Sequence, residues 1–387
     1  MSSNEGLRTA VLVSCGAEPA VVAELLHYNR NLFDQTPAEE SLELPLPDEP
    51  FVAAWRAYAA EISGSDASHE NAWSVLQKRL PQLNFPVAEG MSDTPDYRNA
   101  TRKGADFAGS SAATGLPLEQ PDGLRLLLHP SLAGTIPVLL PAGRGDFVSL
   151  VQALAARNEP RPIPDSMGAI MIAGFNNWDR VAQLRQQWRD EHPGDRGDHA
   201  WRRHFRDFVV PRHALYQDRF IVLSDGPYSG VPAADLGLED GQWQELSLAI
   251  RLEHECTHYF TRRVCGAMHN NLFDELLADY RGVRFALGRY RADWALRFLG
   301  LEDFPAYRSG GRLENYRGDP PLSDEAMAVL GRLVVDAANN LERADQRFFP
   351  AGPGGVGDPQ REAAFLLTLT QLSLEEIAAP EFLERLQ

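Results

Sequence analysis

The stretch "QWQELSLAIRLEHECTHYFTRRVC", residues 242 to 265, carries the strongest structural signal in this chain. It contains no proline and no glycine, and Gly266 follows it as a natural C-terminal stop, so the sequence predicts one long helix. Its apolar residues point in almost every direction, which is typical of a central, buried helix. These residues are Trp243, Leu246, Leu248, Ile250, Leu252, Tyr259, Phe260 and Val264.

Within this helix, His254, Glu255 and His258 spell H-E-x-x-H. Residues four apart lie on one face of a helix, so the two histidines can bind the same cation. Glu255 stands next to the first histidine, where its carboxylate can reach water on that cation. Burial of two histidines among acids is costly without partners, and a metal ion is an efficient partner. The sequence therefore predicts a metal site on this helix.

A second helical pattern, residues 271 to 290, offers further ligands. Glu275 and Asp279 lie one turn apart on the same face of this helix. A catalytic zinc site uses three protein ligands and keeps one position open, so we expect Glu275 to be the third ligand. We expect Asp279 to accept the free N–H of a ligating histidine. Small residues on the flank of this face would let the two helices approach closely: Ala278, Gly282 and Ala286.

The pattern H-E-x-x-H followed by E-x-x-x-D on a second helix resembles the gluzincin clan of zinc metallopeptidases, the thermolysin-like and aminopeptidase-like enzymes. The resemblance implies Zn²⁺ on His254, His258 and Glu275. It implies Glu255 as the general base and Asp279 as the aspartate behind a ligating histidine. The substrate that it implies is a peptide or a small amide.

The chain also departs from the gluzincin pattern. Sixteen residues separate His258 from Glu275, which is fewer than usual, and Asp274 stands where the family usually has Asn. Asp274 and Asp279 are therefore alternative third ligands. Candidates for the group that stabilises the oxyanion are chosen by chemistry alone: His269, Tyr228 and Tyr316.

Two other classes of function stay open. Glu255 and His258 also spell E-x-x-H, the signature of di-iron carboxylate oxygenases, and Glu24 and His27 supply a second copy. A di-iron bundle needs two more glutamate-bearing helices, which the sequence does not offer. A non-catalytic interaction protein with a degenerate zincin fold is the other alternative, and the presence of Glu255 argues against it.

The remaining sequence predicts an α+β protein. Alternating strand-like and helix-like segments favour a mixed α/β domain of unknown role over residues 1–160, with a first strand at 9–15. Three prolines in "NEPRPIPDS" (158–166) indicate a linker. Residues 165–387 are expected to form a mainly helical, zincin-like catalytic domain with a small sheet. The gluzincin resemblance implies that residues 219–230 form an edge strand that holds the substrate backbone.

Charge and composition exclude several classes of partner. The chain has 37 Lys and Arg against 54 Asp and Glu, a net charge of -17 that repels nucleic acids and anionic membranes. It has no long apolar run, no basic leader and only three cysteines, so we expect a cytoplasmic protein. Residues 199–213 gather three histidines and four arginines, as either a solvated helix or a site for a substrate carboxylate or phosphate.

Overall fold

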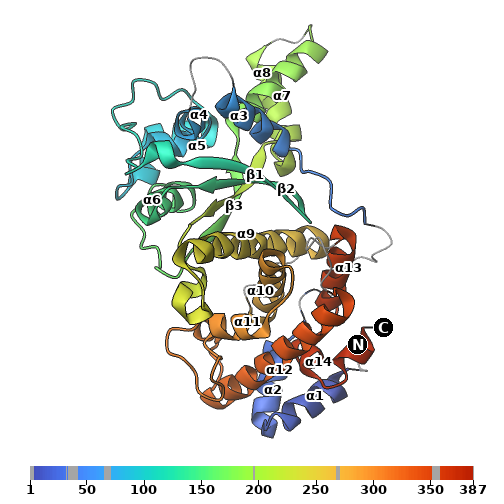
Figure 1. Cartoon of the computed structure of the whole chain (residues 1–387). Coiled ribbons are helices and arrows are strands. Elements are labelled where there is room, and N and C mark those ends of the chain that lie inside the picture. The colour runs from blue at the N-terminus through green and yellow to red at the C-terminus, as the bar shows by residue number, and fades with distance from the viewer. Residues whose placement is uncertain are drawn as a thin grey trace. The chain divides into compact units, whose positions relative to one another are not determined.

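The computed structural model describes residues 4–31, 33, 42–64, 71–194, 197–266, 271–350 and 358–386. In these residues the chain is mainly helical and has one four-stranded sheet, which confirms the α+β class (Figure 1). The chain divides into two compact units. Unit 1 comprises residues 1–46 and 226–387, and unit 2 comprises residues 47–225.

All secondary-structure elements that the structure describes in unit 1 are helices; the segments between them are turns and loops. Its helices are α1 (Glu5–Ser14), α2 (Pro19–Tyr28), α9 (Asp240–Cys265), α10 (Leu272–Leu287), α11 (Ala292–Leu299), α12 (Asp324–Phe348), α13 (Pro359–Thr370), α14 (Leu374–Ala378) and α15 (Phe382–Arg385). The predicted helices at 242–265 and 271–290 are confirmed as α9 and α10, and α9 ends at Gly266, whose φ is 67°. Ser323 caps the N-terminus of α12, and Ser373 caps that of α14 in a capping box with Glu376.

The two ends of the chain meet within unit 1. Arg8 on α1 forms an ion pair of 3.2 Å with Glu375 on α14, and Glu375 is fully buried. The side-chain amide of Asn29 donates to the same carboxylate at 3.1 Å. A buried carboxylate needs such partners, so these contacts hold the N-terminal helices against the C-terminal ones.

The predicted strand at residues 9–15 is wrong. Most of it lies in α1, with Val11 and Leu12 buried. A short run of apolar, β-branched residues does not distinguish a strand from a buried helical turn, and here tertiary packing decides.

The unit boundaries also differ from the boundary predicted near residue 160. The proline-rich segment 158–166 is attached to the body of unit 2 by side-chain hydrogen bonds. Asn158 donates to the carbonyl of Phe85 at 2.8 Å, and Arg144 donates to the carbonyl of Pro164 at 2.7 Å. The prolines therefore shape an anchored loop and do not separate two domains.

Helices α9 and α10 pack closely enough to exclude a side chain at one crossing point. A Cβ atom added to Gly282 on α10 would lie 2.6 Å from the carbonyl oxygen of Ile250 on α9. Real Cβ atoms do not approach backbone oxygens so closely, so Gly282 allows the contact that the small-residue flank predicts.

We expect Gly282→Ala to destabilise unit 1. Alanine in a helix normally gains about 1 kcal/mol over glycine, but here the added methyl group forces the two helices apart, at a cost of about 1–3 kcal/mol. Thermal unfolding followed by circular dichroism measures the change as a lower midpoint. Gly241→Ala on α9 is the control, because no atom lies within 4 Å of its added Cβ. A midpoint raised equally by both substitutions would contradict the close approach.

Unit 2 contains the sheet and six helices. Its elements are α3 (Val52–Ser63), α4 (Ala72–Arg79), α5 (Pro95–Lys103), β1 (Arg125–Ser131), β2 (Gly134–Leu140), α6 (Arg144–Leu154), β3 (Ala169–Asn176), α7 (Trp178–Glu191), α8 (Asp198–His204) and β4 (Gln217–Leu223). The strand order is β1-β2-β4-β3. β1 and β2 form an antiparallel hairpin, β2 and β4 run parallel, and β4 and β3 run antiparallel with a bulge between Ala173 and Phe175.

The expectation that residues 219–230 form an edge strand is wrong. β4 lies between β2 and β3, and its residues Phe220 to Leu223 are fully buried. An uninterrupted apolar run is typical of a strand covered on both faces, and that is how "FIVL" is placed. The edges of the sheet are β1 and β3.

A buried aspartate joins the sheet of unit 2 to its helices. Asp218 is fully buried, and its carboxylate accepts hydrogen bonds from Trp55 at 2.8 Å and from Asn177 at 2.6 Å. Arg180 forms an ion pair of 2.5 Å with the same carboxylate. Asn177 also caps α7.

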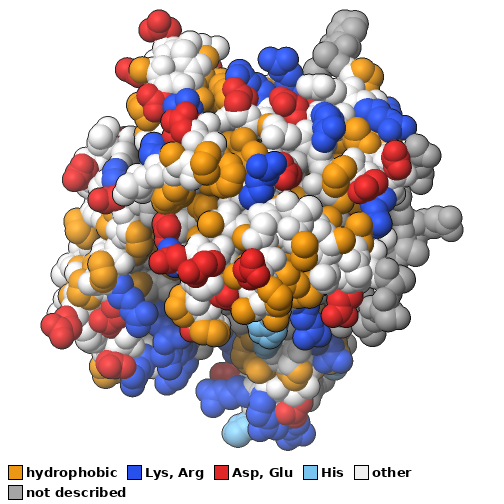
Figure 2. Space-filling view, turned by 90° about the horizontal axis from the view of Figure 1, so that it is seen from below, with side chains coloured by type: hydrophobic (Ala, Val, Ile, Leu, Met, Phe, Trp, Pro, Cys, Tyr) orange, Lys and Arg blue, Asp and Glu red, His pale blue; other side chains and the backbone are white. Residues whose placement is uncertain are grey.

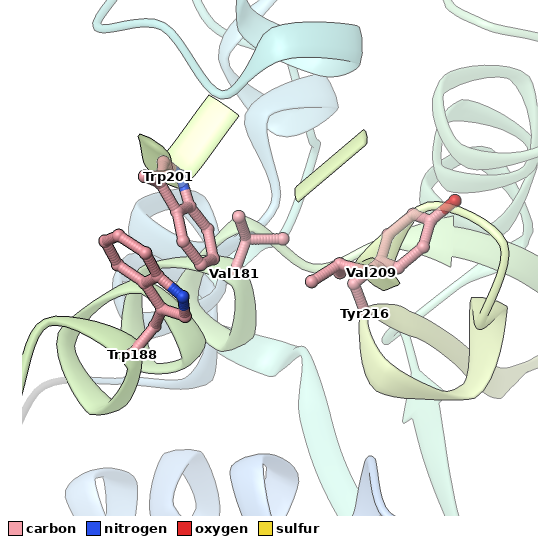
Figure 3. Packing of buried hydrophobic residues seen from close by; sticks show 5 residues of the cluster. All are labelled: Val181, Trp188, Trp201, Val209 and Tyr216. Carbon is pink, nitrogen blue, oxygen red and sulfur yellow. The ribbon is translucent and has the colours of Figure 1, made fainter. Parts of the chain in front are cut away.

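A separate aromatic cluster forms around α7 and α8. Trp188 and Trp201 lie with ring centroids 5.9 Å apart, and Figure 3 shows Val181 beside them and Val209 beside Tyr216. This cluster takes up part of the His- and Arg-rich segment 199–213. Trp201 and Val209 therefore serve as core, while the arginines around them face solvent.

The surface carries mixed charge. On the face in Figure 2, acidic side chains are interspersed with basic and hydrophobic ones. None of the helices in the described ranges has the length and apolar character needed to cross a bilayer.

Candidate metal centre

The two histidines of H-E-x-x-H and Glu275 converge on one point within unit 1. The Nε2 atoms of His254 and His258 lie 3.1 Å apart. The carboxylate of Glu275 lies 3.3 Å from Nε2 of His254 and 3.6 Å from Nε2 of His258. All three side chains are buried, with at most 9% of each residue exposed. α9 supplies the histidines and α10 supplies the carboxylate.

These distances fit the ligand set of a tetrahedral ion. Two ligand atoms bonded at about 2.0–2.1 Å to a tetrahedral zinc ion lie about 3.3 Å from each other. The Nε2 atoms of the two histidines are 3.1 Å apart, and Glu275 approaches His254 with Oε2 at 3.3 Å and His258 with Oε1 at 3.6 Å, distances close to that value. Two imidazoles and one carboxylate are also a donor set that catalytic zinc sites use. The residues present therefore fit Zn²⁺.

Each histidine has an aspartate at its other ring nitrogen. Nδ1 of His254 lies 2.9 Å from Asp279, and Nδ1 of His258 lies 2.9 Å from Asp274. Such carboxylates fix the tautomer of a metal-binding histidine, so that Nε2 keeps a free lone pair. The structure thus brings Asp279 to the place expected of it. It also puts both aspartates on the Nδ1 side, whereas Glu275 faces Nε2, which favours Glu275 as the third ligand.

The ionisable groups of this cluster shift one another's pKa. Burial lowers the pKa of His254, but hydrogen bonds with Asp279 and Glu275 outweigh it and raise the pKa overall. Burial also opposes the charged form of His258, yet Asp274 and Glu275 hold its pKa well above the usual value. The pKa of Glu275 lies well below its usual range, because the two histidines outweigh the effect of burial. A metal ion that binds here therefore displaces protons.

The charge of the cluster favours a divalent cation. Asp274, Glu275 and Asp279 contribute three carboxylates, and Arg312, which pairs with Asp279, contributes one guanidinium. With both histidines neutral, the formal charge is -2. A buried excess of charge is costly, and one divalent ion would neutralise it.

Two tyrosines outside α9 and α10 contact the cluster. Tyr228 donates to Asp279 at 2.6 Å and contacts Nδ1 of His254 at 2.9 Å, so it lies behind the histidine. Tyr316 donates to Glu275 at 2.8 Å, on the side of the converging ligands. Of the three predicted oxyanion candidates, Tyr316 is therefore the one beside the carboxylate, while His269 lies outside the described residues.

Arg312 is the functional residue that sequence reasoning missed. It belongs to the turn Arg312–Tyr316 and donates to the hydroxyl of Tyr228 at 3.1 Å in addition to pairing with Asp279. No spacing or motif in the sequence connects it to α9. It acts on the cluster through Asp279, whose pKa is lowered by Arg312 against the opposing effect of burial.

Glu255 is half-buried next to His254. Within the described part of the chain, its carboxylate makes no hydrogen bond or ion pair. A carboxylate that is not held by a cation stays available to accept a proton from a reacting water.

The second E-x-x-H pair does not join this cluster. Glu24 accepts hydrogen bonds from the backbone N–H and the hydroxyl of Ser323, at 2.6 and 2.7 Å, and so supports the start of α12. His27 is exposed. These contacts give Glu24 a structural role and offer no support for a di-iron site.

Comparison with known proteins identifies the family but no activity. A model described as a family of unknown function, DUF7005, matches residues 10–381. No curated protein and no solved structure matches the chain. The chain therefore belongs to the DUF7005 family, whose function is unknown.

Proposed function

We propose that this protein is a zinc-dependent hydrolase of peptide or amide bonds. The observation that carries the proposal is the convergence of His254, His258 and Glu275, whose ligand atoms all lie within 4.8 Å of one another. The two aspartates at the Nδ1 atoms add support, because they orient both imidazoles in the way that metal-binding histidines require.

Zn²⁺ on these three residues would lower the pKa of a coordinated water toward about 7 and polarise a substrate carbonyl. Glu255, the residue after His254 on α9, is our candidate for the group that would accept the proton of the attacking water and return it to the leaving amine. Tyr316 is the hydroxyl beside Glu275 and the candidate for donating a hydrogen bond to the oxygen that gains charge.

A cytoplasmic location is part of this proposal. None of the three cysteines forms a disulfide, which suits a reducing compartment. We propose a peptide or a small amide as the partner, and the net charge of -17 argues against nucleic acids.

The test combines metal analysis with hydrolysis assays on the purified full-length protein. We expect about one zinc per chain, and we expect cleavage of peptides or small amides to fall by about 100-fold or more after chelation and to return when zinc is added. Two irons per chain with a visible absorption band would favour the oxygenase. A folded protein that takes up no metal when zinc is offered would contradict the proposal.

A further inference from the structure

A cavity of about 580 Å³ lies within unit 2, apart from the candidate metal centre. It is bordered by the C-terminal ends of α5 and α6 and by the edge strand β3 from Ile172 to Asn176, elements that are labelled in Figure 1. Its volume falls within the range of small-molecule sites. Leu154, Ile172 and Phe175 supply apolar surface to it.

The charged residues that line this cavity are both arginines. Arg102 comes from the last turn of α5 and Arg157 from the loop after α6, and no carboxylate lines the space. Neither guanidinium makes a hydrogen bond or an ion pair with another residue that the structure describes. Both arginines are exposed at the border of the cavity, where together they form an anion-attracting site.

The side chain of Tyr97 lines the same cavity. Tyr97 is 3% exposed, and its ring packs edge-on against Phe85 with centroids 5.2 Å apart. Its hydroxyl makes no hydrogen bond to another described residue and is accessible to a ligand in the cavity. Burial raises the pKa of Tyr97 and both Arg157 and Arg102 oppose this, so both guanidiniums act on the hydroxyl.

One acidic residue, Glu159, acts on the same tyrosine. Its carboxylate accepts hydrogen bonds from the backbone N–H groups of Gly90 and Ser92, at 2.9 and 2.8 Å. Glu159 opposes the positive field of the arginines at Tyr97, but it does not line the cavity, whose charged residues are Arg102 and Arg157.

The loop that carries Arg157 is held in an uncommon conformation. Arg157 has a φ of 57° and Asn158 a φ of 59°, in the left-handed region that few non-glycine residues adopt. Asn158 is fully buried, and its amide donates to the carbonyls of Gln82 and Phe85 at 3.0 and 2.8 Å. Asn158 thus fixes the backbone that places Arg157 at the cavity.

We propose that this cavity binds a small organic anion. Its carboxylate or phosphate group binds Arg102 and Arg157 and accepts a hydrogen bond from Tyr97, and its apolar part contacts Leu154, Ile172 and Phe175. Gln82 also lines the space, and its Oε1 atom is buried without a hydrogen-bond partner in the described chain. The site does not depend on the proposed hydrolase function.

The test is isothermal titration of the full-length protein at low salt with probes that share an aromatic ring. They are phenyl phosphate, 3-phenylpropionate and the neutral 3-phenylpropanol. We expect one anion to bind per chain and the neutral alcohol to bind about tenfold more weakly or not at all. Tighter binding of phenyl phosphate identifies a phosphate monoester as the ligand class, and tighter binding of 3-phenylpropionate identifies a carboxylate.

Variants then locate the binding. Arg102→Gln, Arg157→Gln and Tyr97→Phe are each expected to weaken the preferred anion by about tenfold, and Tyr97→Phe keeps the buried ring in place. Arg125→Gln is the matched control, because Arg125 is an exposed arginine of the same unit that does not line the cavity. Absence of binding up to about 10 mM, or equal affinity in wild type and the Arg102→Gln, Arg157→Gln double variant, would overturn the proposal.

Discussion

Replacement of both His254 and His258 by alanine is expected to reduce the zinc content of the protein from about one ion per chain to none. The two Nε2 atoms, 3.1 Å apart, are two of the three ligand positions at the candidate centre. Loss of a carboxylate behind a ligating histidine already costs about 10–100-fold in metal affinity, so loss of two ligands should cost far more. No described residue other than Glu275 faces the same point with a comparable donor.

Elemental analysis and competition with a zinc chelator measure this effect. His27→Ala is the matched control, because His27 is an exposed histidine of the same unit and should not change zinc content. Glu275→Gln and Asp274→Asn separate the possible third ligands. Glu275→Gln should weaken zinc binding more than Asp274→Asn does, and the opposite order would reassign the ligand. Circular dichroism checks that the variants fold.

Glu255→Gln is expected to keep the zinc and to lower turnover by about 10²–10⁴-fold. The amide has nearly the same shape as the carboxylate but cannot accept a proton at neutral pH. Because Glu255 is not one of the three converging ligands, the affinity for zinc should stay within about threefold of wild type. This combination of intact metal and lost turnover separates a general base from a metal ligand.

The comparison needs the wild-type hydrolysis assay and zinc analysis on the same preparations. Glu245→Gln is the control, since Glu245 is an exposed glutamate on the same helix and should leave turnover unchanged. Full activity in Glu255→Gln would remove Glu255 from the mechanism and would leave the water without an identified base.

The sequence predicts the parts of the fold that depend on local pattern. The apolar residues on all sides of the segment and the stop at Gly266 define α9. Helical spacing alone puts His254 and His258 on one face of α9. Here the local helical preference agrees with the tertiary structure, so the helix predicted from the sequence is confirmed.

Features that depend on distant partners are not predicted. Arg8 and Glu375 are separated by 367 residues, and neither lies in a motif, so the sequence does not indicate that the chain ends share one unit. Arg312 reaches Asp279 from a turn without any metal-site signature. Asp274 is named only as an alternative ligand, because the rotation that turns it toward Nδ1 of His258 is set by how α10 packs on α9.

The division of the chain has a consequence for biosynthesis. All of unit 2 lies between the two segments of unit 1, so a ribosome completes unit 2 before it has made most of unit 1. Helices α1 and α2 emerge before unit 2, yet α14, which packs on α1, and α12, which packs on α2, are translated after it. At about 5–20 residues per second, the N-terminal segment waits roughly ten to thirty seconds after unit 2 is finished. During that interval the buried faces of α1 and α2 lack the partners that cover them in the finished protein.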